Sequence, residues 1–161
     1  MRKLFLMPLL AALLLTSCKD DDPTTDPIPE PVSQVDADMR GNWTNTFIKR
    51  EYYSINDTLM HADSANIQAF FKFDGLRLTI TLPNSQVQEV WNYTFPDKDN
   101  PNYIQLNRGS VTTDYIIKSL SDTEMVWIDE TPWAGFPYNV PESQQTISKL
   151  GVFTYKFEKS K

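Results

Sequence analysis

The chain has 161 residues, of which 40% are hydrophobic and 12% aromatic, and a formal net charge of −6. An acidic chain argues against nucleic-acid binding and against electrostatic docking on anionic lipid, because both surfaces repel it. The single cysteine excludes an intramolecular disulfide, so the fold depends on its own hydrophobic core.

The N-terminus has the pattern of a leader. Arg2 and Lys3 precede an apolar run over residues 4–15, which is too short for a spanning helix of about 20 apolar residues. A basic start followed by a short apolar run is typical of a secretory signal peptide. Small residues then lead directly to Cys18, the only cysteine of the chain.

The tetrapeptide Leu15-Thr16-Ser17-Cys18 resembles the lipobox of bacterial lipoproteins. In that family the cysteine thiol receives a diacylglyceryl group and the leader is cut just before it. The resemblance implies a signal peptide over residues 1–17, lipidation of Cys18 and a membrane partner bound through the lipid anchor. Each buried CH₂ adds about 0.8 kcal/mol of membrane affinity, so two or more chains hold firmly. The alternative is an ordinary leader with a free cysteine.

Residues 18–38 are acidic and rich in proline, with few apolar side chains. Such a segment cannot repay its ordering entropy, and its prolines favour an extended tether. The acidic run after Cys18 resembles the surface-export signal of Bacteroidetes lipoproteins, which implies lipid anchoring in the outer membrane and exposure at the cell surface.

From residue 39 the pattern changes to short runs with period-two alternation, which predict half-buried β-strands. Asp74-Gly75 predicts a two-residue hairpin turn. Residues 57–63 fit either a short edge strand or a loop. The predicted strands cover residues 41–53, 67–73, 76–82, 89–95, 103–106, 111–117, 124–129 and 152–157.

A long connection follows from residue 130. Pro141 near its end and Gly151 beyond it predict a short helix over residues 141–149, with the apolar side chains of Ile147 and Leu150 facing inward. Eight strands joined mostly by short turns predict an all-β fold, an eight-stranded antiparallel meander that closes as a barrel when the last strand pairs with the first. Such a barrel holds side chains or one small ligand. A β-sandwich is the alternative.

Gly41-Asn42-Trp43 at the start of the first strand resembles the G-x-W signature of lipocalins, and the meander over residues 39–161 fits a lipocalin-like domain. In that family the tryptophan plugs the closed end of the barrel, which assigns Gly41 and Trp43 a structural role there. A basic partner is expected beside Trp43, with Lys156 or Arg108 as candidates. The resemblance implies a small apolar or amphiphilic ligand.

Aromatic side chains are the candidate ligand-binding residues. One group alternates within the strands and lines a cavity if the interior is hollow: Trp91, Tyr93, Tyr115 and Trp127. A second group falls in the proline-rich connection: Trp133, Phe136 and Tyr138. This connection either packs its own aromatics over a barrel end or forms a lid or stacking platform. Exposed loop aromatics over a filled interior would favour an accessory surface lipoprotein that binds a glycan or a protein partner in an outer-membrane complex.

Catalytic signals are weak. His61 is the only histidine and has no nucleophile motif, so a solvated loop residue is expected. Asp129 and Glu130 are adjacent, and in a strand they point to opposite faces, which suits acid–base chemistry poorly. We therefore expect no enzyme, no metal and no cofactor. The triplets Asp57-Thr58-Leu59 and Asp63-Ser64-Ala65 resemble Bacteroidetes O-glycosylation acceptors, which makes Thr58 and Ser64 candidate modification sites.

Overall fold

The computed structural model describes residues 29–83 and 87–160. The predicted signal peptide over residues 1–17, Cys18 and the first part of the predicted tether lie outside the described residues. No helix among the described residues has the length and apolar character needed to cross a bilayer.

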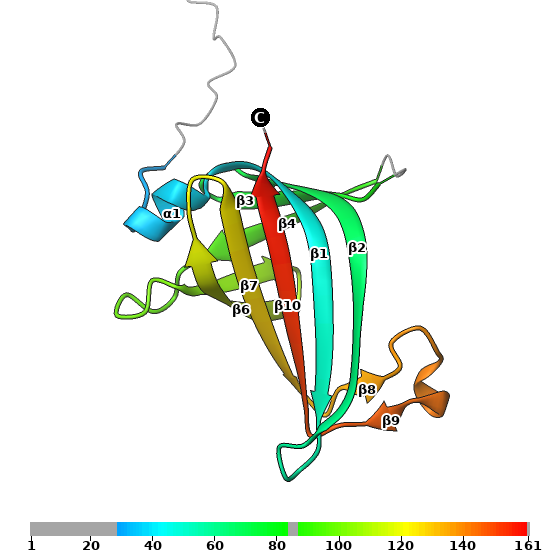
Figure 1. Cartoon of the computed structure of the whole chain (residues 1–161). Coiled ribbons are helices and arrows are strands. Elements are labelled where there is room, and N and C mark those ends of the chain that lie inside the picture. Colours follow the sequence, from blue (N-terminus) through cyan, green and yellow to red (C-terminus); the bar gives the residue numbers. More distant parts are fainter. Residues whose placement is uncertain (1–28, 84–86, 161) are drawn as a thin grey trace, which may run out of the picture.

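Eight antiparallel strands form a closed barrel in the order β1-β10-β7-β6-β5-β4-β3-β2 (Figure 1). The strands are β1 (Gly41–Tyr53), β2 (Leu59–Phe73), β3 (Arg77–Thr81), β4 (Gln88–Thr94), β5 (Tyr103–Arg108), β6 (Val111–Leu120), β7 (Glu124–Pro132) and β10 (Leu150–Lys159).

Pairing of the first strand with the last closes the barrel. The β1–β10 ladder runs from Trp43 opposite Lys159 to Tyr53 opposite Leu150. Every other ladder joins strands that are neighbours in the meander. The predicted all-β, eight-stranded antiparallel meander barrel is therefore confirmed, and the alternative β-sandwich is wrong. Strand β2 begins at Leu59, which settles residues 59–63 as strand.

One end of the barrel is capped by α1 (Gln34–Met39), and we call it the capped end (Figure 1). Ser33 is the N-cap and its hydroxyl accepts a hydrogen bond from the Asp36 amide, which favours a helix start at this position. Met39 is fully buried in the main hydrophobic cluster. The predicted disordered tether over residues 18–38 is thus wrong at its C-terminal end, because this helix belongs to the folded domain.

The opposite end of the barrel separates into two parts. Residues 59–69 of β2 pair only with β1, because the β2–β3 ladder covers just Phe70–Phe73. Residues 129–132 of β7 pair only with β10, because the β6–β7 ladder ends at Ile128. Strands β2, β1, β10 and β7 therefore continue as a four-stranded sheet past the region where the barrel is closed (Figure 1). We call this the splayed end.

The connection between β7 and β10 lies at the splayed end (Figure 1). It contains a two-stranded sheet of β8 (Gly135–Phe136) and β9 (Thr146–Ile147), with the 3₁₀ turn η1 (Glu142–Gln144) between them. The helix predicted over residues 141–149 is therefore reduced to a single 3₁₀ turn. Ile147, predicted to face inward, is 56% exposed. Ile147 and Leu150, whose spacing suggested a helix face, lie instead in β9 and at the start of β10.

Candidate functional site

The inner face of the splayed end carries a row of side chains that crosses four strands. Asp63 of β2 lies opposite Arg50 of β1, and Arg50 lies opposite Phe153 of β10. Phe153 in turn lies opposite Asp129 of β7. Because alternate residues of a strand share a face, these four side chains face the barrel interior together. The row therefore places two carboxylates and a guanidinium inside the mouth of the barrel.

Arg50 is held from two sides. Its Nη1 lies 2.6 Å from Oδ1 of Asp63, and the ring of Tyr138 lies 4.6 Å from its guanidinium carbon. The Arg50 side chain is 16% exposed, and Asp63 lies 3.5 Å from Nε2 of His61. An ion pair this sheltered is screened less by salt than one at the surface. The positive charge of Arg50 is thus largely offset inside the site.

Aromatic rings join the connection to the inner face of the sheet. The ring of Phe136 on β8 stacks on His61 with centroids 5.2 Å apart, and lies 5.0 Å from the ring of Tyr52. Tyr52 also meets Phe153 edge-to-face at 5.8 Å. The close fit depends on Gly151, because a methyl group there would lie 2.6 Å from the Ala134 side chain. His61 is therefore a packed strand residue, and the expected solvated loop histidine is wrong.

Asp129 lies near two tyrosines. Burial raises the pKa of the Asp129 carboxyl, and hydrogen bonding to Thr131 only partly opposes this shift. Burial and the charge of Asp129 raise the pKa of Tyr115 to about 12 and that of Tyr155 above its ordinary value. The tyrosine rings meet edge-to-face at 5.8 Å. A carboxyl group and two phenol groups thus share one half-buried corner of the interior.

Three buried polar atoms have no hydrogen-bond partner among the described residues: Nε of Arg40, the hydroxyl of Tyr52 and Nε1 of Trp127. A buried donor without a partner costs about 1–3 kcal/mol, so native proteins seldom retain one without a bound molecule or a function. Trp127 packs against Tyr115 with centroids 5.2 Å apart, next to the Asp129 corner.

The strand aromatics expected to line a cavity fall into two groups. Tyr93 and Trp127 are 5% and 1% exposed, within the main hydrophobic cluster. Trp91 and Tyr115 are half-buried against that cluster, and the Arg108 guanidinium lies 4.5 Å from the Trp91 ring. The interior is therefore filled around Tyr93 and Trp127, whereas Trp91 and Tyr115 stay partly accessible.

The aromatics of the connection also differ from one another. Phe136 is half-buried against Tyr52 and His61, whereas Trp133 and Tyr138 are 67% and 66% exposed. Tyr138 nevertheless contacts Arg50. The connection therefore both packs over the barrel end and presents two large aromatic side chains to solvent.

At the capped end, Trp43 is fully buried and its indole N–H donates to the carbonyl of Met39 at 2.7 Å. Gly41 has φ +117°, a conformation that favours glycine. The cation beside the Trp43 ring is Lys159, at 4.9 Å, so both expected partners are wrong. Lys156 lies over Phe47 and Arg108 over Trp91. The sequence contained Lys159, but its register with Trp43 depends on barrel closure.

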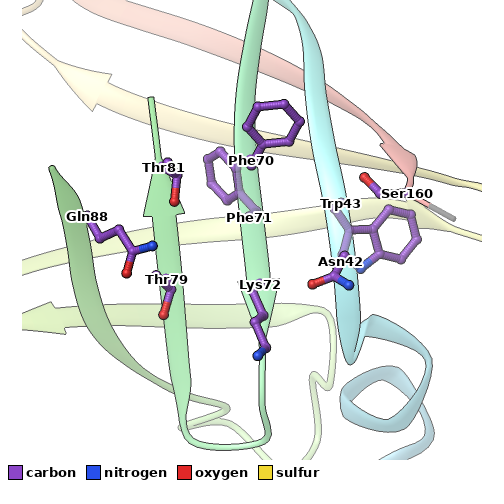
Figure 2. Close-up of a pocket in the computed structure, with 9 residues that line it drawn as sticks. All are labelled: Asn42, Trp43, Phe70, Phe71, Lys72, Thr79, Thr81, Gln88 and Ser160. Carbon is purple, nitrogen blue, oxygen red and sulfur yellow. The ribbon is translucent and has the colours of Figure 1, made fainter. Parts of the chain in front are cut away.

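Several hollows lie outside the inward-facing row of the splayed end. One on the outer wall, of about 340 Å³, is lined mainly by outward-facing side chains of β1 to β4, including Phe70 (Figure 2). Another, of about 860 Å³, lies along the edge of β2 over residues 66–69, where that strand does not pair with β3. These lack charged pairs or converging buried polar groups, in contrast to the inner face of the splayed end. Thr58 and Ser64 are exposed on the β1–β2 turn and on β2.

Sequence reasoning missed Arg50, Asp63, Phe153 and Tyr155 as site residues. A usable signal existed, because Arg50 and Asp63 occupy inward positions of alternating strands, where charges are unusual. Among the described residues, no three His, Cys, Asp or Glu side chains group closely enough to hold a metal ion. No family model, no curated protein and no solved structure matches the chain.

Proposed function

We propose that the protein is a membrane-anchored lipoprotein whose lipocalin-like barrel binds one small amphiphilic ligand at the splayed end. The observation that carries the proposal is the row from Asp63 to Asp129, where half-buried charged and aromatic side chains face the interior beyond the closed part of the barrel. Binding sites of this kind combine an apolar wall with a few converging polar groups.

The position of the N-terminal segment supports a defined orientation. Residues 29–39 enter the domain at the capped end, where the Arg40 guanidinium donates to the Pro29 carbonyl at 2.7 Å. A lipid on Cys18 would therefore attach to the end opposite the ligand site. The mouth would face away from the bilayer and receive its ligand from the aqueous side of the outer membrane, at the cell surface.

The anchor is tested by membrane fractionation of cells that produce the native chain or the Cys18→Ser variant. The native protein is expected in the membrane pellet and Cys18→Ser in the soluble fraction. An unacylated chain that stays in the pellet would remove the anchor from the proposal, whereas the ligand site is tested separately.

The ligand site is tested by native mass spectrometry of the protein purified from its own membrane. A small molecule is expected to travel with the native chain and to be lost in Tyr138→Ala, because that ring covers Arg50 at the mouth. Phe70→Ala removes another exposed aromatic, from the outer wall, and should retain the molecule. Loss in both variants, or retention in both, contradicts the proposed site.

A second candidate is an accessory outer-membrane lipoprotein that binds a glycan or a protein partner through the connection. The exposed ring of Trp133 favours it, because large exposed aromatics stack on sugars and anchor interfaces. A glycan array distinguishes the two functions: Trp133→Ala should abolish glycan binding, whereas Tyr115→Leu inside the barrel should leave it intact.

A further inference from the structure

This inference rests on the proposed function and names the chemistry of the ligand. We infer that the splayed end binds an organic cation whose ammonium group is held by the carboxylate of Asp129 and by the ring faces of Tyr115 and Tyr155.

The first argument comes from the ion pairs of the described residues. Four acidic side chains that are buried or half-buried have an arginine or lysine nitrogen within 3 Å. These pairs are Asp36–Arg40 at 2.9 Å, Glu51–Lys49 at 2.7 Å, Asp63–Arg50 at 2.6 Å and Glu89–Arg108 at 2.8 Å. Asp129 is half-buried as well, yet it forms no salt bridge with any described residue. Among the described residues, Asp129 is thus the inward-facing acidic side chain that has no arginine or lysine partner.

The charges around Asp129 reinforce this conclusion. Asp114 and Glu130 lie close enough to oppose ionisation of its carboxyl. The nearest cation on the same inner row is Arg50, two strands away, and its charge is taken up by Asp63. A carboxylate held among other negative charges in a partly dry site attracts a cation more strongly than it attracts a neutral group.

The aromatic rings supply the second half of the site. Tyr115 and Tyr155 lie edge-to-face at 5.8 Å, and Tyr155 is opposite Trp127, two residues before Asp129 on the same face of β7. Ring faces attract ammonium groups within about 6 Å, and this attraction grows when the cation is desolvated. Carboxylate and ring faces therefore complement one charged head group.

A small organic cation fits these features better than a metal ion. A metal site requires several converging ligands, and among the described residues Asp129 belongs to no such group. The half-buried ring of Phe153, opposite Asp129, instead provides a wall for a hydrocarbon or aromatic tail. The tail lies along that wall while the ammonium reaches Asp129.

The test compares three probes with the same tail: 3-phenylpropylamine, 3-phenylpropan-1-ol and 3-phenylpropanoate. Each is titrated by calorimetry into the full chain in phosphatidylcholine nanodiscs, with empty nanodiscs subtracted. The amine is expected to bind about tenfold or more tightly than the alcohol, and the carboxylate most weakly. Asp129→Asn should remove the preference for the amine, while Asp114→Asn, at an exposed position on β6, should retain it.

A second pair of variants separates the ring from its hydroxyl. Tyr115→Phe keeps the ring face and should retain amine binding, whereas Tyr115→Leu should lose it in a chain that thermal melting shows to be folded at the titration temperature. Alcohol and amine binding equally, or a preference that survives in Asp129→Asn, would overturn the cation assignment and leave the ligand site in place. Failure of all three probes to bind would overturn the ligand site itself.

Discussion

Arg50 and Asp63 face each other across β1 and β2 and form a 2.6 Å ion pair inside the splayed end. Removing one partner leaves the other charge in a sheltered position without its counter-ion, which costs more than removing both. Arg50→Leu is expected to destabilise the fold by about 1–3 kcal/mol, and the double variant Arg50→Leu/Asp63→Leu by less. Urea denaturation of the native protein, of Arg50→Leu, of Asp63→Leu and of the double variant measures the coupling free energy between the two side chains. Strictly additive effects would mean that the pair contributes nothing as a pair.

Replacing Asp129 is expected to stabilise the fold, whereas replacing Arg50 is expected to destabilise it. The pKa of Asp129 is raised in the folded state, so ionisation at neutral pH works against folding. Asp129→Asn is expected to raise the melting temperature of the ligand-free protein at pH 7 by about 1–3 °C. The advantage should shrink as the pH falls and the native carboxyl becomes protonated. A lower melting temperature for Asp129→Asn at pH 7 would show that the carboxylate stabilises the fold.

The buried tyrosines predict a loss of stability in alkali. Tyr115 has a pKa raised to about 12 in the folded protein, against an ordinary value near 10. The stability that the fold gains by keeping the Tyr115 phenol protonated is complete below about pH 10 and is lost as the pH rises toward about 12. Thermal melts between pH 8 and 12 should show this decline, and Tyr115→Phe should make it less steep. An equal decline of the melting temperature in the native protein and in Tyr115→Phe would contradict a raised pKa for Tyr115.

The capped end depends on Asp36. Its carboxylate is 2% exposed and accepts from Arg40 at 2.9 Å and from the Tyr93 hydroxyl at 3.2 Å. Asp36→Ala leaves the Arg40 charge without its partner and is expected to cost about 2–4 kcal/mol. Asp38→Ala, an exposed acid on the same helix, is the matched control and should cost less than about 0.5 kcal/mol. Equal effects in denaturant melts would argue against a structural role for α1.

The contact between the connection and β10 is tested at Gly151. An added methyl would lie 2.6 Å from the Ala134 side chain and 3.0 Å from the Phe153 ring. Gly151→Ala is expected to destabilise the protein by about 1–3 kcal/mol through overpacking. Ala134→Gly in the same chain should restore part of the loss, because it removes the closest atom. Absence of any rescue in thermal melts would show that the strain has another source.

Much of the barrel was predictable because apolar and polar residues alternate along its strands. Strands such as β10 show strict period two, and Asp74-Gly75 gives the turn, where the Asp74 carboxylate accepts from the amides of Leu76 and Arg77. The helix α1 was missed because its short sequence follows a proline-rich, acidic stretch, and its stability depends on tertiary contacts of Asp36 and Met39 as well as on the Ser33 cap. The helix predicted over residues 141–149 failed because apolar spacing in a short segment does not distinguish a helix from a short strand and turn.

The candidate site was predictable only in part. Tyr115 was named from its alternation, but the use of Asp129 depends on which strands stop pairing at the splayed end, and no local pattern records this. The row from Asp63 to Asp129 also crosses the ladder between β1 and β10, which are distant in sequence. The geometry of the candidate site therefore depends on how the strands pair, which no short sequence motif encodes.

The ladder between β1 and β10 also constrains how the chain reaches its native state. Its two strands stand at the beginning and the end of the domain, so the barrel cannot seal until the final segment has been synthesised. Before then, β1 and β7 each expose a row of unsatisfied backbone groups along one side. A nascent chain in this condition can bind chaperones, and it can equally aggregate through these unpaired strand edges.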